Sequence, residues 1–315
     1  MQPLNYLRKA TVDLKSKFIP GLRSFGFHYD ADACESVIDC ANQAVKFVLP
    51  DGGRILNDEL KGLPEILRLP YPNVVIEYTS NEDGGGGLVE KEFGKDKTTP
   101  APKRIVVAKE VDGWIEIYSI VMAKIPAGDC WSMIPFACRV MKSDDQRTKT
   151  SPLKNITNGK DLGIVVVLKP TGSAGISQFG IEWERYAYCD LHDEMMAVLE
   201  LIEALSCKNI DHEPMEVRKI NRGAKNRGAI PFDEYRVLVL RESQNEKTNN
   251  IERGHRSPRE HLRRGHIRRL QSGDKVWVNS TIVNAGADGK IISFYDTRKI
   301  ASNVKYVNEY QRDNV

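Results

Sequence analysis

The chain has 315 residues and a net charge of +3, with 41% hydrophobic and 28% charged residues, a mixture that can bury a core over a length that favours two domains. No apolar run approaches the roughly 20 residues that span a bilayer, and the first residues lack the apolar stretch of a signal peptide. Six scattered cysteines without a C-x-x-C pair favour buried, reduced thiols in a cytosolic protein over a disulfide framework.

The first two thirds of the chain contain helical patterns followed by extended ones. Apolar residues at helical spacing predict helices over residues 4–17, 31–48 and 57–68. Runs rich in β-branched residues predict strands, with Asp112-Gly113 as a hairpin turn, at 74–78, 105–109, 114–122, 130–140 and 164–168. The glycine-rich and charged stretch between the first two strands predicts a mobile surface loop.

Residues 189–206 give the clearest helical pattern. Its apolar stripe comprises Leu191, Met195, Val198, Leu199, Ile202 and Leu205. Asp190, Asp193 and Glu194 are expected in its first turns, where the helix dipole favours carboxylates. These elements predict an α+β class, with helices and a largely antiparallel sheet forming a recognition body over residues 1–210.

The last third of the chain is basic. Between Arg218 and Lys275 there are 16 basic and seven acidic residues, a net charge of +9 that leaves −6 for the rest of the chain. Strands are expected at 235–240 and 291–295, and a β-hairpin at 261–283 with its turn at Gln271–Asp274. We therefore expect a small basic β-rich module over residues 211–315. A solvated basic face without a partner is the alternative.

Seven arginines and three histidines lie between Arg253 and Arg269, with no lysine before Lys275. Because a guanidinium donates in pairs to phosphate oxygens and stacks on bases, this choice favours directed phosphate contacts. A strand here would be basic on both faces, which a half-buried strand does not tolerate without an acidic partner. The expected RNA-binding residues are Arg253, Arg256, Arg259, Arg263, Arg264, Gly265, Arg268, Arg269 and Trp277. Gly265 would allow close backbone approach, and Trp277 either packs the hairpin or stacks on a base.

Two further functions fit the same residues. His261 and His266 could act as acid and base in a metal-independent endoribonuclease, with arginines stabilising the transition state. Alternatively, the basic module docks an acidic protein, as a decoy inhibitor without nucleic-acid contact. The histidine spacing matches no zinc pattern, and the chain has neither a phosphate-binding loop motif nor a nucleophile elbow, so no metal or cofactor is expected.

The string HLRRGHIRRLQSGDKVWVNSTIV, from His261 to Val283, resembles the end of a group of phage and mobile-element proteins. Their shared pattern is an H-x-R-R-G-H-x-R core, a turn with glycine and a V-W-V strand. Upstream similarities cover Pro70–Tyr78, Leu205–Ile210 and Asn226–Leu240. The functionally described relatives are type V-A anti-CRISPR proteins that down-regulate the effector's mRNA during translation.

The resemblance implies a phage-encoded regulator of host–virus interaction in the bacterial cytoplasm. Such a protein would recognise a target protein or nascent chain and engage RNA or the ribosome, lowering expression of its target. The residues that match the shared core, and would carry this contact, are His261, Arg263, Arg264, Gly265, His266 and Arg268.

Overall fold

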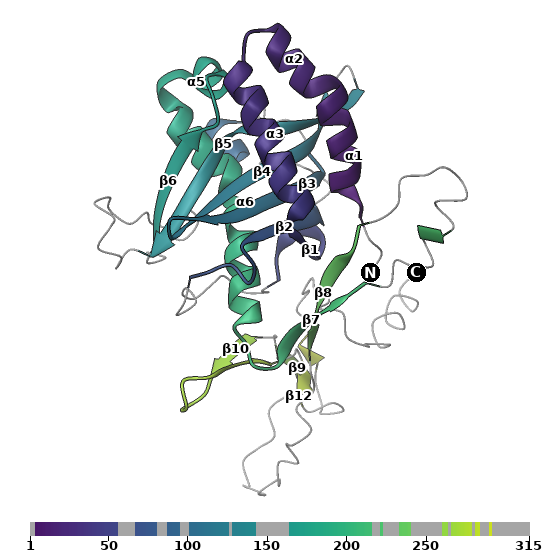
Figure 1. Ribbon diagram of the computed structural model, residues 1–315. Helices are drawn as coiled ribbons and strands as arrows, with labels where there is room; N and C mark the ends of the chain where they lie inside the picture. The colour runs from purple at the N-terminus through teal and green to yellow at the C-terminus, as the bar shows by residue number, and fades with distance from the viewer. Residues whose placement is uncertain are drawn as a thin grey trace, which may run out of the picture.

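An eight-stranded mixed sheet forms the centre of the molecule, with strand order β6-β5-β4-β3-β2-β1-β8-β7 (Figure 1). The computed structural model describes residues 4–55, 67–80, 87–94, 101–125, 128–142, 164–215, 221–222, 233–240, 260–263, 266–278, 281–283 and 290–291. The strands are β1 (Val45–Val48), β2 (Asn73–Thr79), β3 (Lys103–Val111), β4 (Trp114–Ile125), β5 (Gly128–Lys142), β6 (Ile164–Pro170), β7 (Ile210–Pro214) and β8 (Tyr235–Leu240). β1 pairs in parallel with β2 and with β8, and the remaining neighbours are antiparallel.

One face of the sheet is covered by the N-terminal helices. These are α1 (Tyr6–Asp13), the π-helical turn Leu14–Phe18, α2 (Ile19–Ser24) and α3 (His28–Gln43). Side chains alternate across a strand, so Val75 of β2 and Val107 of β3 join this layer, where they pack in one cluster with Leu7 and Ile38. The predicted helix over 4–17 is confirmed.

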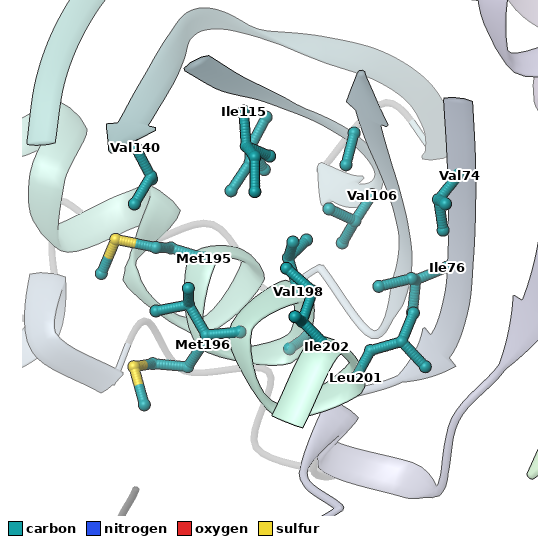
Figure 2. Packing of buried hydrophobic residues seen from close by; sticks show 14 of the residues in the cluster. Val74, Ile76, Val106, Ile115, Val140, Met195, Met196, Val198, Leu201 and Ile202 are labelled. Carbon is teal, nitrogen blue, oxygen red and sulfur yellow. The ribbon is translucent and has the colours of Figure 1, made fainter. Parts of the chain in front are cut away.

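The opposite face is covered by α6 (Trp183–Leu205), which lies behind the sheet in the view of Figure 1. Met195, Val198 and Ile202 are buried against Val74, Ile76 and Val106 of the central strands (Figure 2). The predicted apolar stripe is therefore confirmed, and Met195 and the adjacent Met196 are both core residues. Fully burying such a side chain stabilises the fold by about 1.5 to 3 kcal/mol.

The α+β class and the largely antiparallel sheet are confirmed, but several predicted bounds are wrong. The helix expected over 31–48 ends at Gln43, because Val45–Val48 pairs with β2 and β8 as the interior strand β1. The helix expected from 189 begins at Trp183. Asp190 and Glu194 therefore lie well inside it, and the helix dipole does not explain them.

The expected mobile loop also requires correction. It contains α4 (Gly87–Phe93), whose Leu88 and Val89 are buried with Cys189 of α6. This apolar contact explains why a glycine-flanked, charged segment becomes helical. α5 (Ala174–Phe179) and β7 were not predicted. Most of the helix expected over 57–68 lies outside the described residues.

The C-terminal strands form two smaller sheets, of β10 (His266–Arg269) with β11 (Lys275–Val278), and of β9 (Glu260–Arg263), β12 (Thr281–Val283) and β13 (Lys290–Ile291). The boundary expected at residues 210–211 falls inside β7, which belongs to the large sheet together with β8. Residues 292–295 of the last expected strand are outside the described part of the chain.

The cysteines are free thiols, four of them buried and two half-buried, as the scattered spacing predicted. Among the helices that the structure describes, none has both the length and the apolar character needed to cross a bilayer.

A buried carboxylate joins α1, β2 and β8. The two oxygens of Glu77 accept hydrogen bonds from the backbone N–H groups of Tyr6 and Leu7, at 2.9 and 2.8 Å, and one of them also accepts from the Tyr235 hydroxyl at 2.8 Å. These bonds satisfy two N–H groups at the start of α1 that have no partner within the helix. Burial raises the pKa of Glu77, although the donated hydrogen bonds counteract this shift.

We predict that Glu77→Ala lowers the free energy of unfolding by roughly 3 to 5 kcal/mol, since it leaves three donors in or near the core without an acceptor. Urea denaturation followed by circular dichroism measures the change. The control is Glu213→Ala at an exposed position of β7, expected within about 0.5 kcal/mol of the wild type. Equal stability of the two variants would contradict the role assigned to Glu77.

Candidate nucleic-acid interface

The basic hairpin is built around a glycine turn. β10 and β11 pair antiparallel, with Ile267 opposite Trp277 and Arg269 opposite Lys275. The turn is closed by a 2.7 Å hydrogen bond from the Leu270 N–H to the Asp274 carbonyl. Gly273 has a φ of 87°, which L side chains rarely adopt. The predicted turn at Gln271–Asp274 is therefore confirmed.

A second stretch of pairing extends this hairpin in the same register. Arg263 of β9 lies opposite Thr281 of β12, as His266 lies opposite Val278. Arg263 precedes His266 by three residues and Thr281 follows Val278 by three, so the two stretches share one register. The strand expected over 261–270 thus consists of two described segments, β9 and β10, and residues 264–265 between them are outside the described residues.

The hairpin is attached to the body by a buried ion pair. Lys275, which is 7% exposed, donates from its Nζ to both carboxylate oxygens of Glu203 at 2.9 and 2.8 Å. Glu203 lies in the last turn of α6 and is also buried. A buried ion pair of this geometry is strongly destabilised when one partner is lost.

Trp277 provides a second attachment. Its ring is 6% exposed and belongs to the same apolar core as α6. Asn209 holds the strand, accepting from the Trp277 N–H at 2.6 Å and donating to the Trp277 carbonyl at 2.7 Å. The Lys208 N–H donates to the Lys275 carbonyl at 2.9 Å. The ring is therefore packed against the body, which favours the packing interpretation of Trp277 over a base-stacking platform.

Arg268 and Arg269 are the two predicted arginines whose side chains the structure describes. Both are exposed, and neither makes an ion pair with a described residue. The nearby acidic residue Asp274 accepts from Lys208 at 2.6 Å and from Ser272 at 2.6 Å, and these bonds lower its pKa. Because Glu203 likewise accepts from Lys275, both of these described carboxylates are already paired with other groups.

The other predicted site residues are described less fully. His261 and Arg263 lie on β9 and His266 on β10, and their side chains are outside the described part of the structure. The remaining predicted residues, Arg253, Arg256, Arg259, Arg264 and Gly265, lie outside it altogether. The proposed catalytic pairing of His261 with His266 stays a prediction.

The structure adds a cluster that sequence reasoning missed. Tyr71 precedes β2, His212 lies on β7 and Arg236 on β8, and all three are half-buried. The Tyr71 hydroxyl lies 2.9 Å from His212 Nε2, and an Arg236 guanidinium nitrogen lies 3.0 Å from His212 Nδ1. No sequence motif could have revealed the cluster, since its members come from three distant segments.

A second group of charges lies between α6 and the sheet. Glu194, fully buried, accepts from Arg104 of β3 at 2.7 Å and from Ser119 of β4 at 3.0 Å. Burial is the largest single effect and would lower the pKa of Arg104, but the surrounding acidic groups, with Glu194 the strongest of them, together raise it. Asp190 lies one turn earlier on α6, and burial raises its pKa to about 6 against the opposing effect of Arg104. The arrangement is a structural ion-pair network that ties α6 to two strands.

Within the described residues, no group of three or more histidine, cysteine, aspartate or glutamate side chains could hold a metal ion. No protein-family model, curated protein or solved structure matches the chain.

We predict that Glu203→Ala releases the hairpin, because it leaves the Lys275 ammonium buried without a partner, at a cost of about 3 to 5 kcal/mol. Hydrogen exchange at the amides of residues 266–278 is expected to accelerate. The double variant Glu203→Leu with Lys275→Met, which replaces the pair by apolar side chains, is expected to restore most of the protection. Lys208→Ala removes an exposed ion pair and serves as the control, with little change expected. Unaltered exchange in Glu203→Ala would contradict the anchoring role.

We also predict a pH-dependent effect of Asp190→Asn. Because the folded-state pKa of about 6 lies above the unfolded value near 4, the folded wild type binds more protons in this range and loses stability as pH rises through it. The variant lacks this loss. Relative to wild type, its free energy of unfolding should rise by about 1 to 3 kcal/mol between pH 4 and pH 7. Urea titrations across this range provide the measurement, with Asp129→Asn at an exposed site as the control. A difference that is constant with pH would rule the effect out.

Proposed function

We propose that this protein binds RNA through the hairpin surface around Arg268 and Arg269. The observation that carries the proposal is the pair of exposed guanidinium groups without a described carboxylate partner, on a hairpin that is fixed by the Lys275–Glu203 ion pair. Fixed arginines lose less conformational freedom when they bind a phosphate than arginines on a flexible loop do.

The charge of the surrounding segment supports the same proposal. Residues 218–275 carry a net charge of +9, and a chain segment with this excess of positive charge attracts a polyanion. Consecutive strand residues point to opposite faces. Arg268 and Arg269 therefore present positive charge on both faces of the hairpin, as an RNA strand wrapping its edge would require.

The resemblance to type V-A anti-CRISPR proteins supports a finer proposal. In it, the chain is a phage-encoded regulator, and the RNA is a message being translated, recognised together with its nascent chain on the ribosome. This part rests on the motif from His261 to Val283 alone. Sedimentation of the protein with ribosomes that translate the target, and its loss after puromycin release, would test it.

We predict that Arg268→Ala with Arg269→Ala weakens binding to a single-stranded RNA by about tenfold per arginine, as expected when charge-assisted hydrogen bonds are lost. Fluorescence anisotropy at several salt concentrations should also show a shallower salt dependence. The log–log slope is expected to change by about 1.4, or 0.7 per phosphate contact.

The matched control removes two arginines that already have carboxylate partners. Arg23 pairs with Asp32 and Glu35, and Arg185 pairs with Glu92. Arg23→Ala with Arg185→Ala changes the net charge equally and is expected to leave the slope almost unchanged. Equal losses in both double variants would mean that net charge alone drives binding. A wild-type protein with no salt-dependent RNA affinity, but with a protein complex that survives nuclease, would favour the decoy function instead.

A further inference from the structure

The protonation state of His212 follows from its neighbours. A guanidinium can only donate hydrogen bonds, so the Arg236 nitrogen 3.0 Å from His212 Nδ1 donates to it. The neutral ring then carries its proton on Nε2, which donates to the Tyr71 hydroxyl oxygen at 2.9 Å. The hydroxyl hydrogen of Tyr71 is therefore not used in this pair and can be donated to another group.

The guanidinium of Arg236 is positioned by Tyr71 and His212. It lies over the ring of Tyr71, 5.9 Å from the ring centroid. The His212 ring in turn packs edge-on against Phe47, with 5.7 Å between the two ring centroids. One of the five N–H groups of Arg236 is committed to His212, and in the part of the chain that the structure describes the guanidinium makes no ion pair. Neutral His212 cannot compensate its charge.

We infer that Arg236, His212 and Tyr71 form a phosphate-binding subsite, in which the remaining Arg236 N–H groups and the Tyr71 hydroxyl are the donors. A half-buried guanidinium that has no carboxylate partner among the described residues favours an anion, and its paired N–H groups match two phosphate oxygens. The residues on either side of His212 in β7 are Asp211 and Glu213, and strand alternation places their side chains on the opposite face of the sheet from His212. Carboxylates on the strand therefore do not occupy the position of the anion.

The subsite and the hairpin lie on the same side of the sheet. Tyr71 and Ile267 pack against one apolar core, and β7 begins directly after Asn209, which binds the Trp277 backbone. Strands β7, β8 and β10 gather at one end of the molecule (Figure 1). One source of the phosphate is an RNA strand that also contacts Arg268 and Arg269. This assignment of the ligand rests on the proposed function. The other source is a free phosphate group.

The test uses Arg236→Lys, which keeps the charge and removes the planar fork, and Tyr71→Phe, which keeps the ring and removes the hydroxyl. RNA affinity is expected to fall about tenfold in the first and about threefold in the second, with thermal unfolding unchanged. In parallel, inorganic phosphate is titrated into ¹⁵N-labelled protein, with the backbone amide resonances of His212 and of position 236, which both variants retain, as the reporters. The hairpin variant Arg268→Ala with Arg269→Ala is measured alongside.

The outcomes separate the two proposals. Loss of RNA affinity in Arg236→Lys supports an RNA phosphate as the ligand, whether or not the hairpin variant binds. Loss of the inorganic-phosphate response with unchanged RNA affinity supports a free-phosphate subsite. If Arg236→Lys changes neither binding reaction, the subsite is overturned, even where the hairpin variant loses RNA and the proposed function stands. Loss of affinity in Arg236→Lys alone would overturn the hairpin surface and retain the subsite.

Discussion

The ion pair between Lys275 and Glu203 determines where the basic end of this protein lies. It joins the hairpin to the last turn of α6 within a region that excludes water, and α6 is itself packed against the centre of the sheet. In such surroundings the ion pair fixes the position of the hairpin more than it stabilises the folded state, because the cost of desolvating both charges offsets most of their attraction. The exposed arginines of β10 therefore have a defined orientation relative to the rest of the fold.

The same principle recurs elsewhere in the molecule. Glu77, Glu194 and Glu200 are buried carboxylates that each join segments distant in the sequence, and Glu200 accepts from the Ile55 N–H at 2.7 Å and from Arg54 at 2.5 Å. An apolar contact tolerates small rotations, whereas a carboxylate with two or three donors does not. Together these groups align α1 and α6 with the strands between them.

Local patterns were sufficient to predict α6, most central strands and the glycine turn of the hairpin, since period and turn chemistry are properties of short segments. They failed at Val45–Val48, where a β-branched segment directly follows a helix and its extended form depends on pairing with β2 and β8. They also failed for α4, whose helix depends on contact with α6.

The candidate site likewise contains residues that the sequence predicted and contacts that only the structure shows. Arg268 and Arg269 were visible in the sequence as part of an arginine-rich segment, and the structure adds that they are exposed and lack a described carboxylate partner. Burial of Trp277 could be expected from its residue type, but not the contact with Asn209 that fixes it. The Tyr71–His212–Arg236 cluster depends entirely on long-range strand pairing, and no spacing rule applies to it.

The position of β8 has a consequence for synthesis of the protein on the ribosome. β1 is an interior strand of the sheet, yet one of its edges pairs with β8, which follows much later in the chain, with Lys46 opposite Tyr235. Until those residues emerge, that edge has unpaired N–H and C=O groups, and the Glu77 carboxylate lacks the Tyr235 donor 158 residues away. A product truncated before β8 would therefore present an unpaired strand edge, a feature that favours aggregation.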